Sequence, residues 1–284
     1  MHTPLPAADG ELLERAGIDT SLPAEGGLFR HDGWLRRVSG EPSVLFGGGC
    51  ALLLEVAHPL VAAGVAEHSD FRRDPFGRLQ RTLAAVTALA FAPRADALAA
   101  ARGVARSHER VRGRLAAAVG PFAAGTPYHG RDPDLVLWVW GTLVETALAV
   151  YRDFVAPLDD TALAEYHRDQ RAMAILLGAP PARTAGDAAS FRAWFDGVVA
   201  GETLQVGDTA REIARAVLET PGADRGPVPL ITAALLPPRL RTGFDLPWDS
   251  SREASYRRLV ASVRGMRRAP EQAGRRLARP EASS

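Results

Sequence analysis

The sequence predicts an all-α protein: a single-domain helical bundle that encloses a pocket and is globin-like in general architecture. Three observations support this fold class. Apolar residues recur at helical spacing in one segment after another, and Asp-Pro or Pro steps mark where segments begin and end. No segment alternates convincingly as a strand does, residues 228–232 being the only weak candidate. A chain of 284 residues, 46% of them hydrophobic, can bury the core of one large domain.

The expected elements follow in chain order. Residues 1–27 are rich in Pro and Gly, which predicts an irregular N-terminal arm. The helical domain is expected over residues 28–268, and an Arg-rich C-terminal tail over residues 269–284. Within the domain, helices are predicted over residues 28–39, 43–57, 59–67, 75–92, 94–119, 135–151, 159–177, 187–201, 208–219 and 250–265.

Two of these helices are important for the expected pocket. The segment from Leu135 to Tyr151 follows Asp132-Pro133 and is apolar nearly all round, which is typical of the central helix of a bundle. The helix over residues 94–119 carries one apolar stripe, formed by Leu98, Ala101, Val104, Ala105, His108, Val111 and Leu115. We therefore expect the second helix to pack on the core along a face that includes a histidine.

Composition excludes several function classes. The formal net charge of +1 gives no field that would attract nucleic acid. A single cysteine, Cys50, excludes a disulfide within the chain and an all-cysteine metal site. Lysine and asparagine are absent, which excludes Schiff-base chemistry, P-loop phosphate binding and an Asn-dependent triad. No Gly-x-Ser-x-Gly elbow is present, so hydrolase chemistry is not indicated.

The sequence also bears on location and assembly. Residues 44–66 form a long apolar run, but Glu55, His58 and Pro59 interrupt it, and an ionisable residue near the bilayer centre is costly. We therefore expect no stable membrane span. The N-terminus lacks a basic region followed by an apolar one, so a cytoplasmic protein without a signal peptide is expected. The long apolar helices would suit a homodimer, although no motif demands one.

Candidate chemistry gathers in residues 55–113, where histidines and arginines interrupt apolar helix. Burying such groups is costly unless each has a partner, so their convergence indicates a metal or cofactor between helices. His108 lies on the apolar stripe of its helix. It is either a core histidine bonded to a carbonyl or a proximal ligand presented to haem iron.

Arg78, Arg81 and Thr82 share a face of the helix that starts at Pro75. They form either a solvated polar face or a group that binds haem propionates and donates hydrogen bonds to an oxygen ligand. Spacing alone does not separate these interpretations.

Glu55 and His58 form a Glu-x-x-His motif, which four-helix di-iron proteins use in duplicate. The motif occurs once here, so a di-iron site would lack half of its ligands. A mononuclear non-haem iron site made by Glu55, His58 and His68 stays open as an alternative.

Several short motifs, each present once, follow one another in a specific order along the chain. They are His58-Pro-x-Val-x-x-Gly-Val-x-x-His68-Ser, Asp74-Pro-x-x-Arg78-Leu-x-x-Thr82, His108-x-x-Val-x-Gly113, Tyr128, Asp132-Pro-Asp-Leu-x-x-Trp138-Val, Leu176-Leu-Gly178, Phe191-Arg-Ala-Trp194-Phe and Leu236-Pro-Pro-Arg239-Leu-Arg241. Together they resemble the rubber oxygenase family, which includes bacterial latex-clearing proteins and the MpaB-type oxygenase of fungal mycophenolic acid biosynthesis. The resemblance covers nearly the whole chain.

The resemblance implies an all-helical fold around one haem b, with oxygen chemistry on hydrophobic, often isoprenoid, substrates and dioxygen as co-substrate. The position that matches the proximal iron ligand is His108. The distal polar group of the latex-clearing enzymes falls on Arg78, Arg81 and Thr82, with Arg78 also suited to a haem propionate. His68 would be a further member of the cofactor pocket.

Two departures separate this chain from the family pattern. Arg81 stands where the latex-clearing enzymes have a lysine, and a guanidinium is planar and always charged, so the change is not conservative. Trp140 stands where many relatives have a histidine, and the distal acidic residue has no clear match.

Taken together, these features predict a haem b-dependent oxygenase or oxidoreductase that acts on a small hydrophobic substrate such as an isoprenoid or a secondary metabolite. Two alternatives stay open. One is a non-catalytic haem-binding carrier or sensor, and the other is the non-haem iron enzyme described above.

Overall fold

The computed structural model describes residues 7–21, 24–69, 71, 75–219 and 226–277, without the side chains of residues 7, 8, 24, 75–79 and 268–277. These residues form thirteen α-helices, three short 3-10 helices and one two-stranded sheet, which confirms the all-α prediction. The helices are α1 (Ala7–Ala16), α2 (Trp34–Ser39), α3 (Gly48–Val56), α4 (Pro59–His68), α5 (Pro75–Phe91), α6 (Arg94–Arg110), α7 (Pro133–Phe154), α8 (Asp160–Leu176), α9 (Ala188–Ala200), α10 (Asp208–Leu218), α11 (Val228–Leu235), α12 (Pro238–Gly243) and α13 (Ser250–Leu277). The 3-10 helices are Ala24–Gly26, Pro42–Gly47 and Pro181–Arg183, and strands β1 (Arg112–Arg114) and β2 (Pro127–His129) pair antiparallel.

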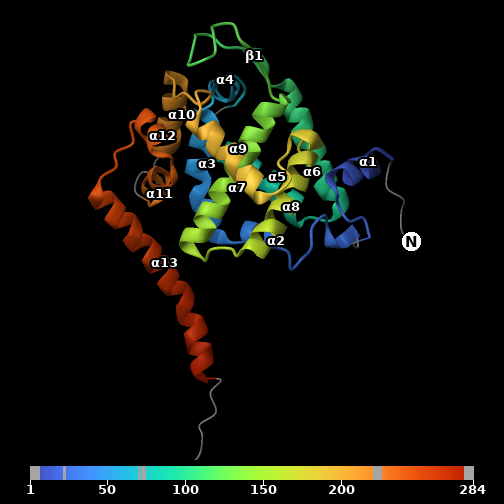
Figure 1. Ribbon diagram of the computed structural model, residues 1–284, viewed down its shortest axis with the longest axis vertical. Coiled ribbons are helices and arrows are strands. Elements are labelled where there is room, and N and C mark those ends of the chain that lie inside the picture. Colours follow the sequence, from blue (N-terminus) through green and yellow to red (C-terminus); the bar gives the residue numbers. More distant parts are fainter. Residues whose placement is uncertain (1–6, 22–23, 70, 72–74, 220–225, 278–284) are drawn as a thin grey trace, which may run out of the picture.

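Helix α7 lies in the middle of the bundle, as the sequence predicted (Figure 1). Its start is fixed by Pro133 and by Asp132, whose side chain accepts a hydrogen bond from the Asp134 amide at 2.9 Å. The buried indole of Trp138 donates to the carbonyl of Leu54 at 3.1 Å and so ties α7 to α3. Apolar packing on most of its circumference therefore holds α7 between the surrounding helices.

The structure contains one described helix, α7, that is long and apolar enough to cross a membrane by length and composition. Of its most apolar window, 56% is buried inside the protein, as in the core helix of a globular bundle. The segments 42–56 and 59–68 are long and apolar enough to cross a membrane only if they are counted as one helix, and the chain bends by 108° between them. The bend falls at His58, which is extended before Pro59, as expected for a residue that precedes proline.

The structure corrects the prediction at both ends of the chain. The expectation of an irregular arm over residues 1–27 is wrong for Ala7–Ala16, which form α1 because Leu13 and Ala16 lie on one helical face and are buried. At the other end, α13 continues to Leu277, through the predicted start of the tail (Figure 1). Tyr256 anchors α13 to the body by donating to Asp153 at 2.7 Å.

Two further expectations are wrong within the domain. The helix predicted over residues 94–119 ends at Arg110, and the chain turns into the β1–β2 hairpin. At Gly113 a Cβ would collide with the hydroxyl of Tyr128, so the hairpin requires glycine there. Residues 228–232, the weak strand candidate, begin helix α11 instead. A short apolar run does not distinguish a buried strand from a buried helix.

Candidate functional site

Helices α5 and α6 form the antiparallel pair that carries most of the predicted site residues. The chain reverses at Ala92 and Pro93, where α5 has ended and α6 begins. Near this reversal Leu89, Ala90 and Leu98 are fully buried in a cluster with α1, α2 and α8. The two helices pack on each other after this reversal, so the first half of α5 and the second half of α6 both lie away from it.

Burial decreases along the pair towards its far end. Leu83 and Val86 of α5 are only half-buried, and so are Val104 and Ala105 of α6. Apolar side chains that line two facing helices without being fully covered are well suited to an apolar ligand. The candidate site is therefore the end of the α5–α6 pair that lies away from Ala92 and Pro93.

His108 lies in the last turn of α6 at this far end and is half-buried. Burial lowers the pKa of His108, and the nearby Arg131 guanidinium lowers it further, so the imidazole is neutral at pH 7. The hairpin fixes the backbone at this point, because Val111 donates to the carbonyl of His108 at 3.1 Å. A Cβ on Gly130 would lie 2.7 Å from the same carbonyl. A neutral imidazole on a fixed backbone is a suitable metal ligand.

Arg81 and Thr82 lie on the first half of α5, away from the reversal, as His108 does on α6. Both are exposed in the structure. Arg78 lies one turn earlier on the same helix, and its side chain is outside the described part of the structure. The fold therefore brings the helical segments of the predicted group to one end of the α5–α6 pair.

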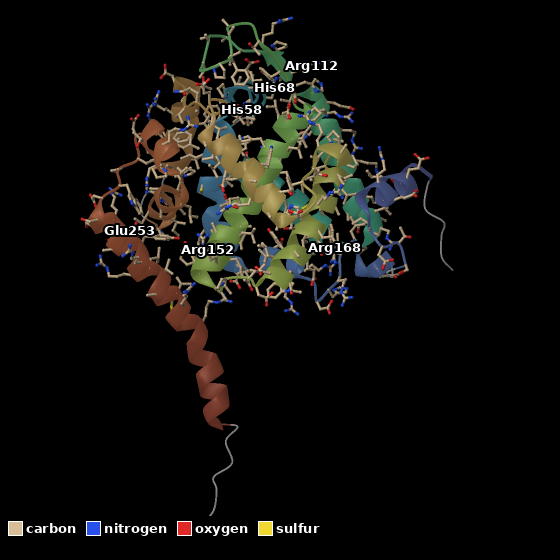
Figure 2. The ribbon with its side chains drawn as sticks, in the orientation of Figure 1. His58, His68, Arg112, Arg152, Arg168 and Glu253 are labelled. Atoms are coloured by element: carbon tan, nitrogen blue, oxygen red, sulfur yellow. The ribbon has the colours of Figure 1, made fainter. Side chains whose placement is uncertain are left out.

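His68 ends α4 and has a different set of contacts. His68 lies beside Arg112 (Figure 2), with its Nε2 3.1 Å from the carbonyl oxygen of Arg112. Its ring also meets the edge of the Tyr128 ring. The Tyr128 hydroxyl donates in turn to Glu67 at 2.6 Å. These contacts fasten the β1–β2 hairpin to α4, so the structure gives His68 a role in holding the hairpin.

The ligand set Glu55, His58 and His68 is not assembled. His58 and His68 stand at opposite ends of α4, about 15 Å apart at 1.5 Å per helical residue. Two histidines that bind one metal ion must have their backbones closer than this. Among the described residues, no group of three or more His, Cys, Asp or Glu side chains is placed to hold a metal ion. The mononuclear iron site proposed for these three residues is therefore wrong.

His58 is instead a buried capping residue. Its Nδ1 accepts a hydrogen bond from the amide of Leu60 at 3.3 Å, and its ring packs on Phe122 at 5.2 Å between centroids. Burial lowers the pKa of His58 to about 4, although the Asp132 carboxylate opposes this shift. The imidazole is therefore neutral in the folded protein and keeps its cap at neutral pH.

This pKa predicts an acid-labile fold. An unfolded histidine binds a proton near pH 6.5, whereas His58 in the folded chain does so only near pH 4. Between these values the unfolded state holds more protons, so the free energy of unfolding should fall by up to about 3 kcal/mol as pH drops. The measurement is urea unfolding between pH 7 and pH 4. His58→Asn keeps an acceptor for the cap and should flatten this slope, and an unchanged slope would contradict the assignment.

Sequence reasoning missed a buried polar group outside the α5–α6 pair. His167 of α8 and Trp140 of α7 are both buried, and their rings lie 6.4 Å apart beside Phe191. Neither the His167 Nε2 nor the Trp140 Nε1 has a hydrogen-bond partner among the described residues. Burial lowers the pKa of His167, with Asp187 opposing the shift. The sequence signal was weak, because Tyr166 and His167 lie in a helix with many polar residues.

Comparison with known proteins gives one match. Residues 35–265 match the family model described as ER-bound oxygenase mpaB/B'/rubber oxygenase, catalytic domain. The matched span runs from α2 into α13 and includes the whole α5–α6 pair and the hairpin. No curated protein and no solved structure gives a significant match. The description names ER-bound members, and the cytoplasmic location of this chain stays a prediction.

Proposed function

This chain belongs to the ER-bound oxygenase mpaB/B'/rubber oxygenase catalytic-domain family, and from that membership we propose that it is a haem b-dependent oxygenase acting with dioxygen on a small apolar molecule. The observation that carries the proposal is the extent of the match, which covers residues 35–265 and so includes every element of the α5–α6 site. An isoprenoid or a secondary metabolite of similar character is the substrate class that we propose.

The chemistry of the described residues fits a haem group. His108 offers a neutral imidazole, the form that binds iron. Leu83 and Val104 offer half-buried apolar side chains on the two helices of the same pair. Arg81 adds a guanidinium that suits a propionate or another anionic group. An apolar cofactor with anionic edges matches this combination.

In this proposal the residues have separate tasks. When bound, haem supplies the activation of dioxygen that amino-acid side chains cannot provide. His108 would hold the iron, and Arg78 would pair with a propionate. Arg81 and Thr82 would donate hydrogen bonds that orient dioxygen and the small substrate. The hairpin held by His68 keeps the end of α6 in position.

Oxygen uptake tests the proposal against the non-catalytic alternative. Haem-loaded protein should consume oxygen above its background rate when an apolar substrate such as squalene, geranylgeraniol or an apolar phenol is added. The assay is run with an oxygen electrode, with and without ascorbate as reductant. A haem carrier or sensor would bind haem and ligands but would show no substrate-dependent uptake with any of these compounds.

A further inference from the structure

A cavity away from the α5–α6 pair opens beside α7. It has a volume of about 310 Å³ and is formed by α3, α7, α9 and the segment that joins α11 to α12. Its walls are mixed: apolar side chains such as Leu54, Phe195 and Leu235 line it beside a group of polar side chains. None of its lining residues belongs to α5 or α6, so it is separate from the proposed oxygenase site.

The polar groups of this cavity are few and carry a net negative charge. Arg192 of α9 donates to one carboxylate oxygen of Glu145 on α7, and its Nε lies 3.4 Å from Asp196. One guanidinium therefore faces two carboxylates. The Glu145 side chain is only 17% exposed, whereas the Asp196 side chain is 63% exposed and marks the solvent side.

Two side chains in the cavity can form a further or stronger hydrogen bond with a ligand. Among the described residues, Glu145 has no hydrogen-bond partner other than Arg192, which leaves its second oxygen as an acceptor. Thr146 is 4% exposed, and the partner of its hydroxyl is the Cys50 sulfur at 4.0 Å, which is a weak acceptor. A buried polar group is costly unless it forms a good hydrogen bond, so this arrangement favours a ligand with a polar end.

We propose that this cavity binds a small apolar amine. The apolar part of the ligand would pack on Leu54, Phe195 and Leu235, and the ammonium group would donate to the free oxygen of Glu145. A carboxylate ligand would meet the net negative charge that Glu145 and Asp196 leave after pairing with Arg192, and this charge disfavours it. A neutral alcohol satisfies the same acceptor but lacks the charge, so it should bind more weakly. This site is independent of the proposed oxygenase function.

Three probes of the same shape test the proposal: 1-aminoadamantane, 1-adamantanol and adamantane-1-carboxylate. Their binding to the full-length protein is measured by isothermal titration calorimetry at pH 7. We expect the amine to bind most tightly, the alcohol about tenfold more weakly and the carboxylate not at all. Failure of the amine to bind, or equal binding of amine and carboxylate, would overturn the proposal.

Substitutions in the cavity test whether it is the binding site of the amine. Val199→Trp fills the cavity and should abolish binding of the amine, whereas Val198→Trp, at a half-buried neighbour that does not line it, should leave binding unchanged. Glu145→Gln keeps an acceptor but removes the charge, so amine affinity should fall about tenfold while alcohol affinity is kept.

Melting temperatures establish that each variant is folded. If Val199→Trp does not fold, Ala149→Leu fills the cavity from the α7 side and should have the same effect. Amine binding that survives in a folded cavity-filling variant would show that the ligand sits elsewhere and would overturn the proposal.

Discussion

His108→Ala is expected to purify as a folded protein without haem, because the change removes the side chain that we propose as the iron ligand. The side chain is half-buried at the end of α6, so its loss should cost little stability. The measurement is haem content per protein chain by the pyridine haemochrome assay, together with the melting temperature. Haem content should fall to a small fraction of the wild-type value.

His129→Ala is the matched control for this variant. His129 is also half-buried, lies at the end of β2 and accepts one hydrogen bond, from the Arg131 amide at 3.0 Å. It is not assigned to the iron, so its loss should leave haem content unchanged. A normal Soret band in His108→Ala would show that the ligand assignment is wrong.

Arg81→Ala and Thr82→Ala are expected to keep most of their haem but to weaken cyanide binding. Both residues are proposed to donate hydrogen bonds to a small ligand of the cofactor, whereas His108 is proposed to hold the iron. Removing one donor to a charged ligand costs about 1.5–3 kcal/mol, which is roughly a tenfold to hundredfold loss of affinity. The measurement is a spectrophotometric cyanide titration of each haem-loaded variant.

Thr87→Ala provides the control on the same helix. Thr87 is exposed like Thr82 but lies nearer the reversal at Ala92, where the pair is closed by buried apolar side chains. Its loss should not change cyanide affinity. Wild-type affinity in both Arg81→Ala and Thr82→Ala would remove these residues from the proposed site and leave them as solvated residues of α5.

Much of the fold was predictable because local signals coincide with packing. Asp132 and Pro133 fix the start of α7, and its apolar circumference correctly predicts a central position. The hairpin after α6 was not predictable, because Val111 and Leu115 continue the helical spacing of the stripe even though they pack on α4 from the hairpin. The spacing of apolar residues indicates which side chains are buried. A helix and a hairpin can bury the same side chains, so the spacing does not distinguish them here.

The candidate site was predictable only in part, for a related reason. The spacing of Arg81 and Thr82 and the position of His108 on its helix are local properties, and the reversal at Pro93 brings the two helices together. The ion pair between Glu145 and Arg192 joins residues that are 47 positions apart, so it depends on how α9 packs on α7. The wrong iron site fails for a different reason, because the helix predicted over residues 59–67 already places His58 and His68 at its two ends, too far apart to bind one ion.

The absorption spectrum of the purified wild-type protein tests the central claim most directly. The account predicts a Soret band and a pyridine haemochrome of non-covalent haem b at about one haem per chain, since the single cysteine excludes a Cys-x-x-Cys-His attachment. A colourless protein that takes up no haem when hemin is added would contradict it.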